Sequence, residues 1–298
     1  TTLVSWRACL AEAACQGMFV SIFDIRSAYL KADLEEETYL APFPGVTPPR
    51  KGMVMKLIHP LYGLCQAGRS FYKHLHKTMT SMGLVRSEND HCLYTYRAKD
   101  GNILRVNCHV DDCCVTHSSP KLYARFRKEL SRAYDISEAD DDNKFLGMVI
   151  ERLGDGSLQV HQRQYVEDML TRYRHADCTP VNTPFQSGVK LSKDQCPKTE
   201  EEKAKMAKVP YRQLVGSLMH LANCTRADIS VALGLCAKFC VNPGRPHWQA
   251  LQWILRYLKG KPDLGLIYGR KVPGVPFSPL HGYVDGSWGS DPDDRRST

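Results

Sequence analysis

The chain has 298 residues, 43% of them hydrophobic and 24% charged, and its 40 Lys and Arg exceed its 32 Asp and Glu to give a formal charge of +8. This is the composition of a globular protein with one large or two modest cores, and the basic excess permits a phosphate-bearing partner without requiring one. No apolar run reaches the roughly 18–20 residues of a membrane-spanning helix, and the first residues lack the pattern of a signal peptide, so we expect no membrane partner.

Helices and strands alternate through the first half of the chain. Residues 3–16 place Leu3, Trp6 and Leu10 on one helical face, and Gly17 ends that helix. The other expected helices are 69–82, 119–133, 164–173, a charged helix from Thr199, 227–240 and 246–259. The expected strands are 18–25, 37–43, 53–58, 92–97, 103–110, 113–117, a hairpin over 145–161 that turns at 154–157, 264–269 and 281–288. This order predicts the α+β fold class: a mixed body, a helical segment, then the start of a β-rich part.

The chain contains 12 cysteines but no Cys-x-x-Cys motif. Cys113 and Cys114 are adjacent inside a strand-like run, which does not suit a disulfide framework. We therefore expect reduced, mostly buried thiols in an intracellular protein.

Two adjacent aspartates, Asp111 and Asp112, separate two strand-like runs in NCHVDDCCV (107–115). Burying carboxylates costs several kcal/mol unless a partner compensates. Neighbouring side chains on a straight strand point to opposite faces, so we place the pair at the bend of a hairpin. Two carboxylates crowded there would raise each other's pKa, and a divalent cation would favour both ionised forms. A small set of oxygen ligands suits Mg²⁺.

Asp24 ends the apolar strand MFVSIFD and is the candidate for a third carboxylate. Two ions held about 3.5–4 Å apart by such acids can activate a 3′ hydroxyl and stabilise a leaving pyrophosphate, which is nucleotidyl transfer. The alternative is that the aspartate pair is a solvated turn. We expect an exposed loop of that kind at ADDDN (139–143), which lacks apolar flanks.

Several motifs in fixed order resemble the reverse transcriptase of copia-type long-terminal-repeat retrotransposons. The palm motifs of that family are similar to FDIRSAYLKADLEEETYLAPFPG (23–45), LYGLCQAGRSFY (61–72), DHCLYTY (90–96) and HVDD (109–112). Further similar segments are KFLGMVIER, PYRQLVGSLMHLANCTRADIS, HWQALQWILRYLKG and, at the start of ribonuclease H, GYVDGSWGSDPDDRRST. The resemblance covers the chain from about residue 3 to its end.

The resemblance implies a right-hand polymerase with an antiparallel palm sheet, fingers and thumb. On that basis residues 1–175 are the fingers and palm core and 176–198, polar and proline-containing, are a linker. Residues 199–260 are a helical thumb or connection, and 261–298 are the truncated start of a ribonuclease H-like domain.

The resemblance also implies the roles of the acidic residues. Asp24 and Asp111 would bridge two Mg²⁺ ions, with Mn²⁺ as an alternative ion. Asp112 would lie nearby, and the backbone carbonyl of Ile25 would be a further ligand. Tyr29 matches the ring that excludes a ribose 2′ hydroxyl, so deoxynucleotides are the expected substrates.

Other substrate-binding positions implied by the resemblance are Tyr62, Gly63, Gln66, Arg69, Leu146 and Gly147. The first two match positions that pack on the incoming nucleotide, and the last two match the primer grip, although FLG could equally serve packing in a hairpin. For the middle two, an ordinary turn and helix start is an equal alternative. The implied partners are an RNA or DNA template, a DNA or tRNA-type primer and dNTPs, with the oligomeric state left open.

The chain departs from the family pattern at three positions and at both ends. His109 stands where Tyr is usual, Gly68 where Pro is usual and Cys65 where Lys is common. The basic fingers segment of the family precedes residue 1, and only Asp285 matches a ribonuclease H carboxylate. We therefore expect a Pol polyprotein fragment without ribonuclease H activity.

The leading interpretation is an RNA-directed DNA polymerase domain. The first alternative is an inactive retroelement remnant that only binds nucleic acid. The missing fingers segment and the three departures favour it, and the intact Asp24, Asp111, Asp112 and Tyr29 oppose it. The second is a metal-dependent nuclease, which would cleave without deoxynucleotides and which Tyr29 and LYGLCQAG disfavour. The family implies location in cytoplasmic virus-like particles and then the nucleus.

Overall fold

The structure is a computed structural model that describes residues 1–45, 50, 52–138, 143–269 and 293–295. The chain divides into two compact units, 1–146 with 150–158, and 147–149 with 159–298. Helices and antiparallel sheets are mixed, which confirms the expected α+β class. In the described ranges no helix is both long and apolar enough to cross a membrane. The expected strand 281–288 and Asp285 lie outside the described residues.

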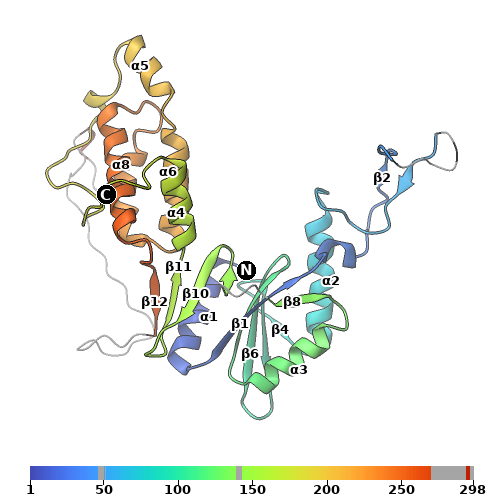
Figure 1. Cartoon of the computed structure of the whole chain (residues 1–298). Helices are drawn as coiled ribbons and strands as arrows, with labels where there is room; N and C mark the ends of the chain where they lie inside the picture. The colour runs from blue at the N-terminus through green and yellow to red at the C-terminus, as the bar shows by residue number, and fades with distance from the viewer. Residues whose placement is uncertain (46–49, 51, 139–142, 270–292, 296–298) are drawn as a thin grey trace. The chain divides into compact units, whose positions relative to one another are not determined.

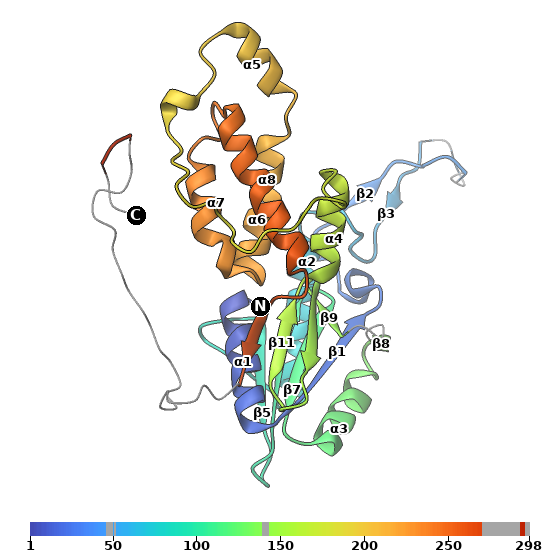
Figure 2. The same cartoon turned by 60° about the vertical axis from the view of Figure 1, so that its left-hand side comes forward.

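A six-stranded sheet forms the centre of the first unit, and β1 and β7 lie side by side within it (Figures 1 and 2). In spatial order its strands are β4 (Val85–Arg86), β5 (Leu93–Arg97), β6 (Ile103–His109), β7 (Asp112–His117), β1 (Phe19–Ile25) and β8 (Ile136–Glu138). The antiparallel register of β1 and β7 runs from Phe19 opposite His117 to Asp24 opposite Asp112. This register brings together two acids that are far apart in sequence.

Helices cover both faces of this sheet because its central strands are apolar on both sides. Phe23, Cys113 and Val115 face a core shared with α2 (Ala67–Ser81) and α3 (Pro120–Leu130). The opposite face packs against α1 (Leu3–Gln16), whose buried Trp6 lies 5.3 Å between ring centroids from Phe145. Burial on both faces explains why the sequence shows continuous apolar runs here rather than strict alternation.

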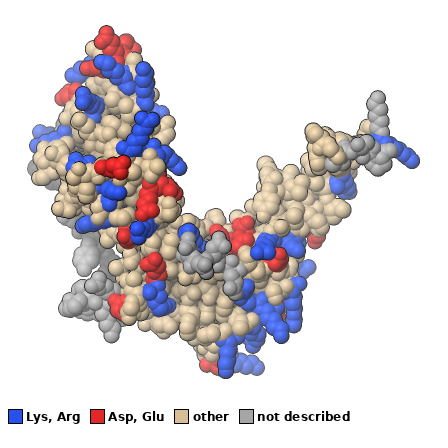
Figure 3. Space-filling view, in the orientation of Figure 1, with Lys and Arg blue, Asp and Glu red and all other residues tan. Residues whose placement is uncertain are grey.

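The helix ends follow the signals read from the sequence. Thr2 caps α1 and Gly17 ends it with φ 64°, and Ser119 caps α3 with Pro120 in its first turn. Figure 3 shows that Lys and Arg side chains gather over the part of the first unit that carries α2 and α3. The exposed basic residues of these two helices include Arg69, Lys73, Lys77, Lys121, Arg125 and Lys128.

Three shorter pieces complete the β structure. The strands β2 (Tyr39–Leu40) and β3 (Met55–Lys56) pair with each other, and the one-turn helix η1 (Ala28–Lys31) follows β1. Both strands are much shorter than the expected 37–43 and 53–58, in part because Pro42 cannot donate a ladder hydrogen bond. A four-stranded sheet has the order β12 (Leu266–Tyr268), β11 (Leu158–His161), β10 (Met148–Arg152) and β9 (Lys144–Phe145).

The second unit is mainly helical. Its core is built from one face each of α4 (Arg163–Arg172), α6 (Tyr211–Cys224), α7 (Ser230–Ala237) and α8 (Arg245–Gly260). Two short helices, η2 (Lys193–Gln195) and η3 (Ala227–Ile229), connect these elements. The charged helix α5 (Glu200–Ala207) buries no side chain and begins with the expected capping box of Thr199 and Glu202.

Candidate active site on the β6–β7 hairpin

The two aspartates of the HVDD segment occupy different parts of a tight hairpin. The strands β6 and β7 close with His109 opposite Asp112, so Val110 and Asp111 form the bend and Asp112 is already the first residue of β7. The bend therefore lies one residue earlier than expected, because the two-residue turn leaves only one of the acids outside the strand. The shift matters, since it is the strand position of Asp112 that sets it opposite Asp24.

Asp24, Asp111 and Asp112 are gathered at one end of the central sheet. Asp24 and Asp112 are register partners, so their side chains share a face, and the backbone N–H of Ile25 donates to the carbonyl of Asp111 over 3.0 Å. Ile25 itself is fully buried at the end of β1. All three carboxylates are partly exposed, so they are open to a ligand from solvent.

Mutual repulsion and burial act on these carboxylates. Burial raises the pKa of Asp24 above its ordinary value, the charge of Asp111 raises it further, and Arg26 lowers it. Burial also raises the pKa of Asp112, and so do the charges of Asp111 and Asp24, while His109 opposes them. Sequence reasoning did not identify Arg26, although a cation two positions after an acid was a visible signal.

The carboxylate oxygens of this site are suitable ligands for a divalent cation, but they do not form a complete metal site. Among the described residues no group of three or more His, Cys, Asp or Glu is arranged to hold a metal ion. The carboxylates are nevertheless close together, because the charge of Asp111 raises the pKa of both Asp24 and Asp112. A bound cation would relieve this repulsion between like charges.

Two tyrosines lie beside the carboxylates. The rings of Tyr29 and Tyr62 meet edge to face with centroids 4.6 Å apart, and Tyr29 also contacts Phe71 at 6.2 Å. Burial and the charge of Asp111, with smaller effects of Tyr29 and Asp24, raise the pKa of Tyr62 above its ordinary value. Tyr62 is 60% exposed, so this ring is both close to the acids and open to solvent.

The other predicted positions are spread over two turns. Gly63 has φ 99° in the turn before α2, Gln66 is the N-cap residue of that helix without a side-chain capping hydrogen bond, and Arg69 lies exposed in its first turn. Leu146 and Gly147, with φ 52° and 74°, form the two-residue turn between β9 and β10. The interactions of these residues assign none of them to a substrate.

Val110 has an unfavourable backbone conformation at the tip of the hairpin. Its φ of 58° is rare for a β-branched residue and costs about 1–3 kcal/mol. We expect Val110→Gly to stabilise the chain by about 1 kcal/mol, because glycine adopts this conformation freely and loses only part of the gain to greater unfolded-state entropy. Urea denaturation measures the change.

A matched control for Val110→Gly is Val85→Gly, since Val85 is an exposed strand residue with ordinary φ. That variant should lose stability, because glycine weakens a strand. Equal losses in both variants would show that packing of the Val110 side chain outweighs its backbone strain.

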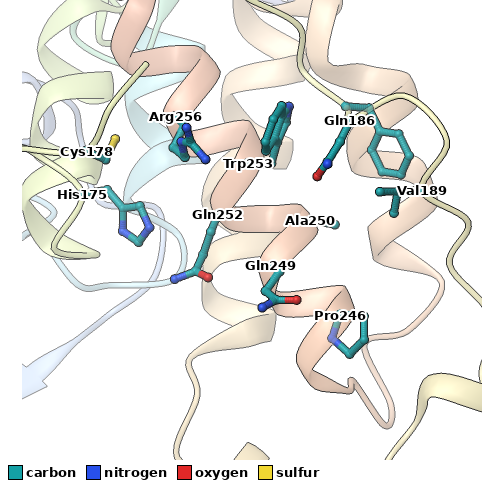
Figure 4. A pocket seen from close by; sticks show the side chains of 11 residues that line it. His175, Cys178, Gln186, Val189, Pro246, Gln249, Ala250, Gln252, Trp253 and Arg256 are labelled. Atoms are coloured by element: carbon teal, nitrogen blue, oxygen red, sulfur yellow. The ribbon is translucent and has the colours of Figure 1, made fainter. Parts of the chain in front are cut away.

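A cavity of about 550 Å³ lies entirely within the second unit, and none of the predicted site residues lines it (Figure 4). Trp253 and Arg256 of α8 line it, together with His175 and Cys178 of the segment that follows α4. The Trp253 indole donates to the Thr183 carbonyl over 2.9 Å and the Arg256 guanidinium to the Thr179 carbonyl over 2.8 Å. Part of the expected linker 176–198 is thus attached to α8.

Comparison with known proteins assigns the chain to a protein family. A family model described as reverse transcriptase (RNA-dependent DNA polymerase) matches residues 2–187, which include the whole acidic hairpin and β1. The chain belongs to the reverse transcriptase family. It is 37% identical over 298 residues to the retrovirus-related Pol polyprotein from transposon TNT 1-94 of Nicotiana tabacum, which covers 99% of this chain and 22% of the relative.

Two further relatives support the same assignment. The Pol polyprotein from transposon RE1 of Arabidopsis thaliana is 33% identical over 295 residues, covering 99% of this chain and 19% of that protein. A putative transposon Ty5-1 protein of Saccharomyces cerevisiae is 29% identical over 236 residues, covering 79% of this chain and 74% of that protein. The resemblance to copia-type reverse transcriptases is therefore confirmed, and the chain spans about a fifth of the length of the two Pol polyproteins.

Proposed function

We propose that this chain carries the polymerase site of an RNA-directed DNA polymerase and adds deoxynucleotides to a primer 3′ hydroxyl. The observation that carries the proposal is the register that sets Asp24 opposite Asp112, with Asp111 at the adjoining bend. Membership of the reverse transcriptase family supplies the reaction class. The substrates would be an RNA or DNA template, a primer and dNTPs.

The side chains around the hairpin suit this reaction. Asp24, Asp111 and the Ile25 carbonyl would hold two Mg²⁺ ions, with Asp112 beside them. The ions would lower the pKa of the attacking hydroxyl and neutralise charge on the leaving pyrophosphate. The fold orients Asp24 and Asp112, because β1 and β7, which carry them, lie inside a sheet that is buried on both faces.

The arrangement of the first unit supports a right-hand polymerase. We infer that the six-stranded sheet with α1, α2 and α3 is the palm and that the segment of β2 and β3 belongs to the fingers. The helices α6, α7 and α8 would be the thumb or connection, and the chain from 261 would begin a ribonuclease H-like domain. Exposed cations on α2 and α3 favour contacts with nucleic-acid phosphates, so affinity should fall steeply with salt.

Primer extension tests the proposal directly. The folded chain would be incubated with a poly(rA)–oligo(dT) duplex, Mg²⁺ and labelled dTTP, and extended primers would be resolved by length. Extension that requires both the duplex and Mg²⁺ is the expected result. Binding of the duplex without extension would instead support a remnant that only binds nucleic acid, and shortening of the strands without dTTP would indicate a nuclease.

Tyr29 is proposed as the residue that discriminates against a ribose 2′ hydroxyl. It is half-buried between Tyr62 and Phe71, so its ring is held in place from two sides. We expect Tyr29→Val to reduce the preference for dTTP over UTP by on the order of 10²-fold, the range in which a pocket rejects an added hydroxyl. The ratio of kcat/KM for the two nucleotides measures it.

The matched control for Tyr29→Val is Tyr29→Phe, which keeps the ring and removes only the hydroxyl. This variant should retain the preference for dTTP. Equal loss in both variants would assign the discrimination to the phenolic hydroxyl rather than to the ring.

A further inference from the structure

Two cysteines face each other directly behind the acidic hairpin. Cys108 of β6 and Cys113 of β7 are register partners, one step inward from the pair of His109 and Asp112 that closes the bend. Cys108 is 2% exposed and Cys113 is fully buried, and both lie in the core beneath α2 and α3. The neighbouring Cys108 thiol and burial raise the pKa of the Cys113 thiol above its ordinary value.

The backbone hydrogen bonds show which kind of cross-strand pair this is. The N–H of Cys108 donates to the Cys92 carbonyl over 2.9 Å, so the polar backbone groups of Cys108 point toward β5 and away from β7. Cys108 and Cys113 are therefore a non-hydrogen-bonded pair, for which the Cα atoms typically lie about 4.5 Å apart with the side chains close together. That separation lies at the short end of the 4.4–6.8 Å range of disulfides, so a bridge can form after a small movement of the backbone.

We propose that Cys108 and Cys113 form a reversible disulfide under oxidising conditions, and that this bond controls the acidic hairpin. All 12 cysteines are free in the structure, which is the reduced state. Disulfides in reducing compartments are mostly transient and regulatory, which suits a bond at the base of a functional hairpin.

A third thiol gives the buried pair access to an oxidant. Cys92 is partly exposed, directly precedes β5 and accepts the backbone hydrogen bond of Cys108, so the three cysteines follow one another from the edge of β5 to β7. The Cys92 thiolate attacks a small-molecule disulfide such as oxidised glutathione and releases one glutathione. The Cys108 sulfur then attacks the Cys92 sulfur and releases the second glutathione.

The last exchange moves the bond inward. The Cys113 sulfur attacks the Cys108 sulfur, so that Cys92 leaves as a thiol and Cys108 and Cys113 are joined. Overall, two protein thiols lose two electrons and two protons, and one glutathione disulfide becomes two glutathione thiols. The inner pair is favoured as the final product because its non-hydrogen-bonded geometry brings the Cβ atoms closer.

The bond should alter the position of the acids. In disulfides the Cα atoms most often lie about 5.5–6 Å apart, against about 4.5 Å for a non-hydrogen-bonded pair, so the bridge shifts β6 and β7 relative to each other next to Asp112. We expect the oxidised chain to polymerise on the order of 10–100 times more slowly, since displacements near 1 Å have such effects. This effect rests on the proposed polymerase function, whereas formation of the bond does not.

The experiment uses the whole folded chain in glutathione buffers with increasing fractions of the oxidised form. After acid quenching and alkylation, cleavage before Asp111 separates Cys108 from Cys113, so that mass spectrometry can find the linked peptides. The expected product is the Cys108–Cys113 link, with slower primer extension that dithiothreitol restores. A final link between Cys92 and Cys108, or no link at any ratio, would overturn the proposal.

Variants assign the link and separate it from the polymerase proposal. Cys114→Ala is the matched control, because Cys114 points to the opposite face near Trp6 and Cys9 and should leave both the link and the inhibition unchanged. Cys113→Ala and, independently, Cys108→Ala should stay active in the oxidising buffer, and Cys92→Ala should only slow oxidation. A link in a chain that never extends primers would refute the polymerase proposal alone, and full activity of the linked chain would refute control by the bond.

Discussion

Asp111→Asn should abolish primer extension while making the folded chain more stable at neutral pH. The substitution keeps the shape of the side chain and removes one charge from a site proposed to hold two cations. Loss of several kcal/mol of transition-state stabilisation corresponds to about a thousandfold or more in rate. Single-turnover extension with labelled dTTP measures this effect.

The gain in stability follows from the pKa shifts of its neighbours. Burial and the charge of Asp111 raise the pKa of Asp24 and of Asp112, so ionising these groups at neutral pH opposes folding. Removing the charge of Asp111 lowers both pKa values toward the ordinary one. The melting temperature of the variant should therefore exceed that of the unmodified chain at pH 7, and the difference should disappear in acid, where these carboxyls are protonated in both folded and unfolded chains.

Asp100→Asn is the control, because it removes one exposed carboxylate from the turn at the far end of the same sheet. It should leave extension intact and should not raise the melting temperature, since hydrogen bonds from Asn102 lower the pKa of Asp100. Mg²⁺ should stabilise the unmodified chain more than Asp111→Asn. Unchanged extension by Asp111→Asn would refute the proposed site.

The sequence was sufficient to predict the local elements around the site. The expected strand 18–25, the strands on either side of the acidic pair and the caps at Thr2, Gly17 and Ser119 all agree with the structure. These features depend on side-chain periodicity and on capping residues, which are local properties. The structure differs at the bend, which includes Val110, because a two-residue closure depends on which residues of β6 and β7 pair.

The helical unit shows what local patterns miss. The helix α6 was not separately predicted, although Tyr211, Leu214, Val215 and Leu218 recur at helical spacing and are all buried. The expected helix 227–240 is instead η3 followed by α7, which ends at Ala237, and Arg226 just before η3 pairs with Asp228 within it. This pair joins a buried Arg226 to a partly exposed Asp228 and leaves little periodic signal in the sequence.

For the site, too, the sequence shows which residues are present but not which of them come together in the fold. Carboxylates at a strand end and at a hairpin identify the chemistry, but their approach depends on the pairing of β1 with β7 across much of the chain. The contact of Tyr62 with Tyr29 likewise depends on the packing of η1 against α2. Cys108 and Cys113 bear on the same hairpin only because the register sets them opposite each other.

Asp228→Ala should strongly destabilise the second unit. The Arg226 side chain is 1% exposed, and its guanidinium donates to both Asp228 carboxylate oxygens at 3.0 and 2.9 Å and to the Lys261 carbonyl at 2.8 Å. The Tyr257 hydroxyl also donates to Asp228, over 2.8 Å. Removing the carboxylate leaves a buried guanidinium without its counter-ion, which costs about 3 kcal/mol.

The control for Asp228→Ala is Asp263→Ala, which breaks an ion pair of similar length in the same unit. Arg163 and Asp263 lie 3.0 Å apart, but their side chains are 56% and 59% exposed, so solvent screens the pair and this loss should be much smaller than that of Asp228→Ala. Urea denaturation combined with hydrogen exchange over 211–260 would assign the change to this unit. Similar losses in the two variants would show that burial of Arg226 does not strengthen its pair.

The pH dependence gives the Asp228 pair an independent signature. Burial acts to raise the pKa of Asp228, but hydrogen bonds from Arg226 and Tyr257 outweigh it and hold that pKa below its ordinary value. Because the pKa of Asp228 is lower in the folded than in the unfolded chain, its ionisation stabilises the fold at neutral pH. This contribution is lost as the pH falls through the folded-state pKa of Asp228. The stability difference between the unmodified chain and Asp228→Ala should therefore be greatest near pH 7 and shrink in acid, whereas a packing defect alone would leave it constant.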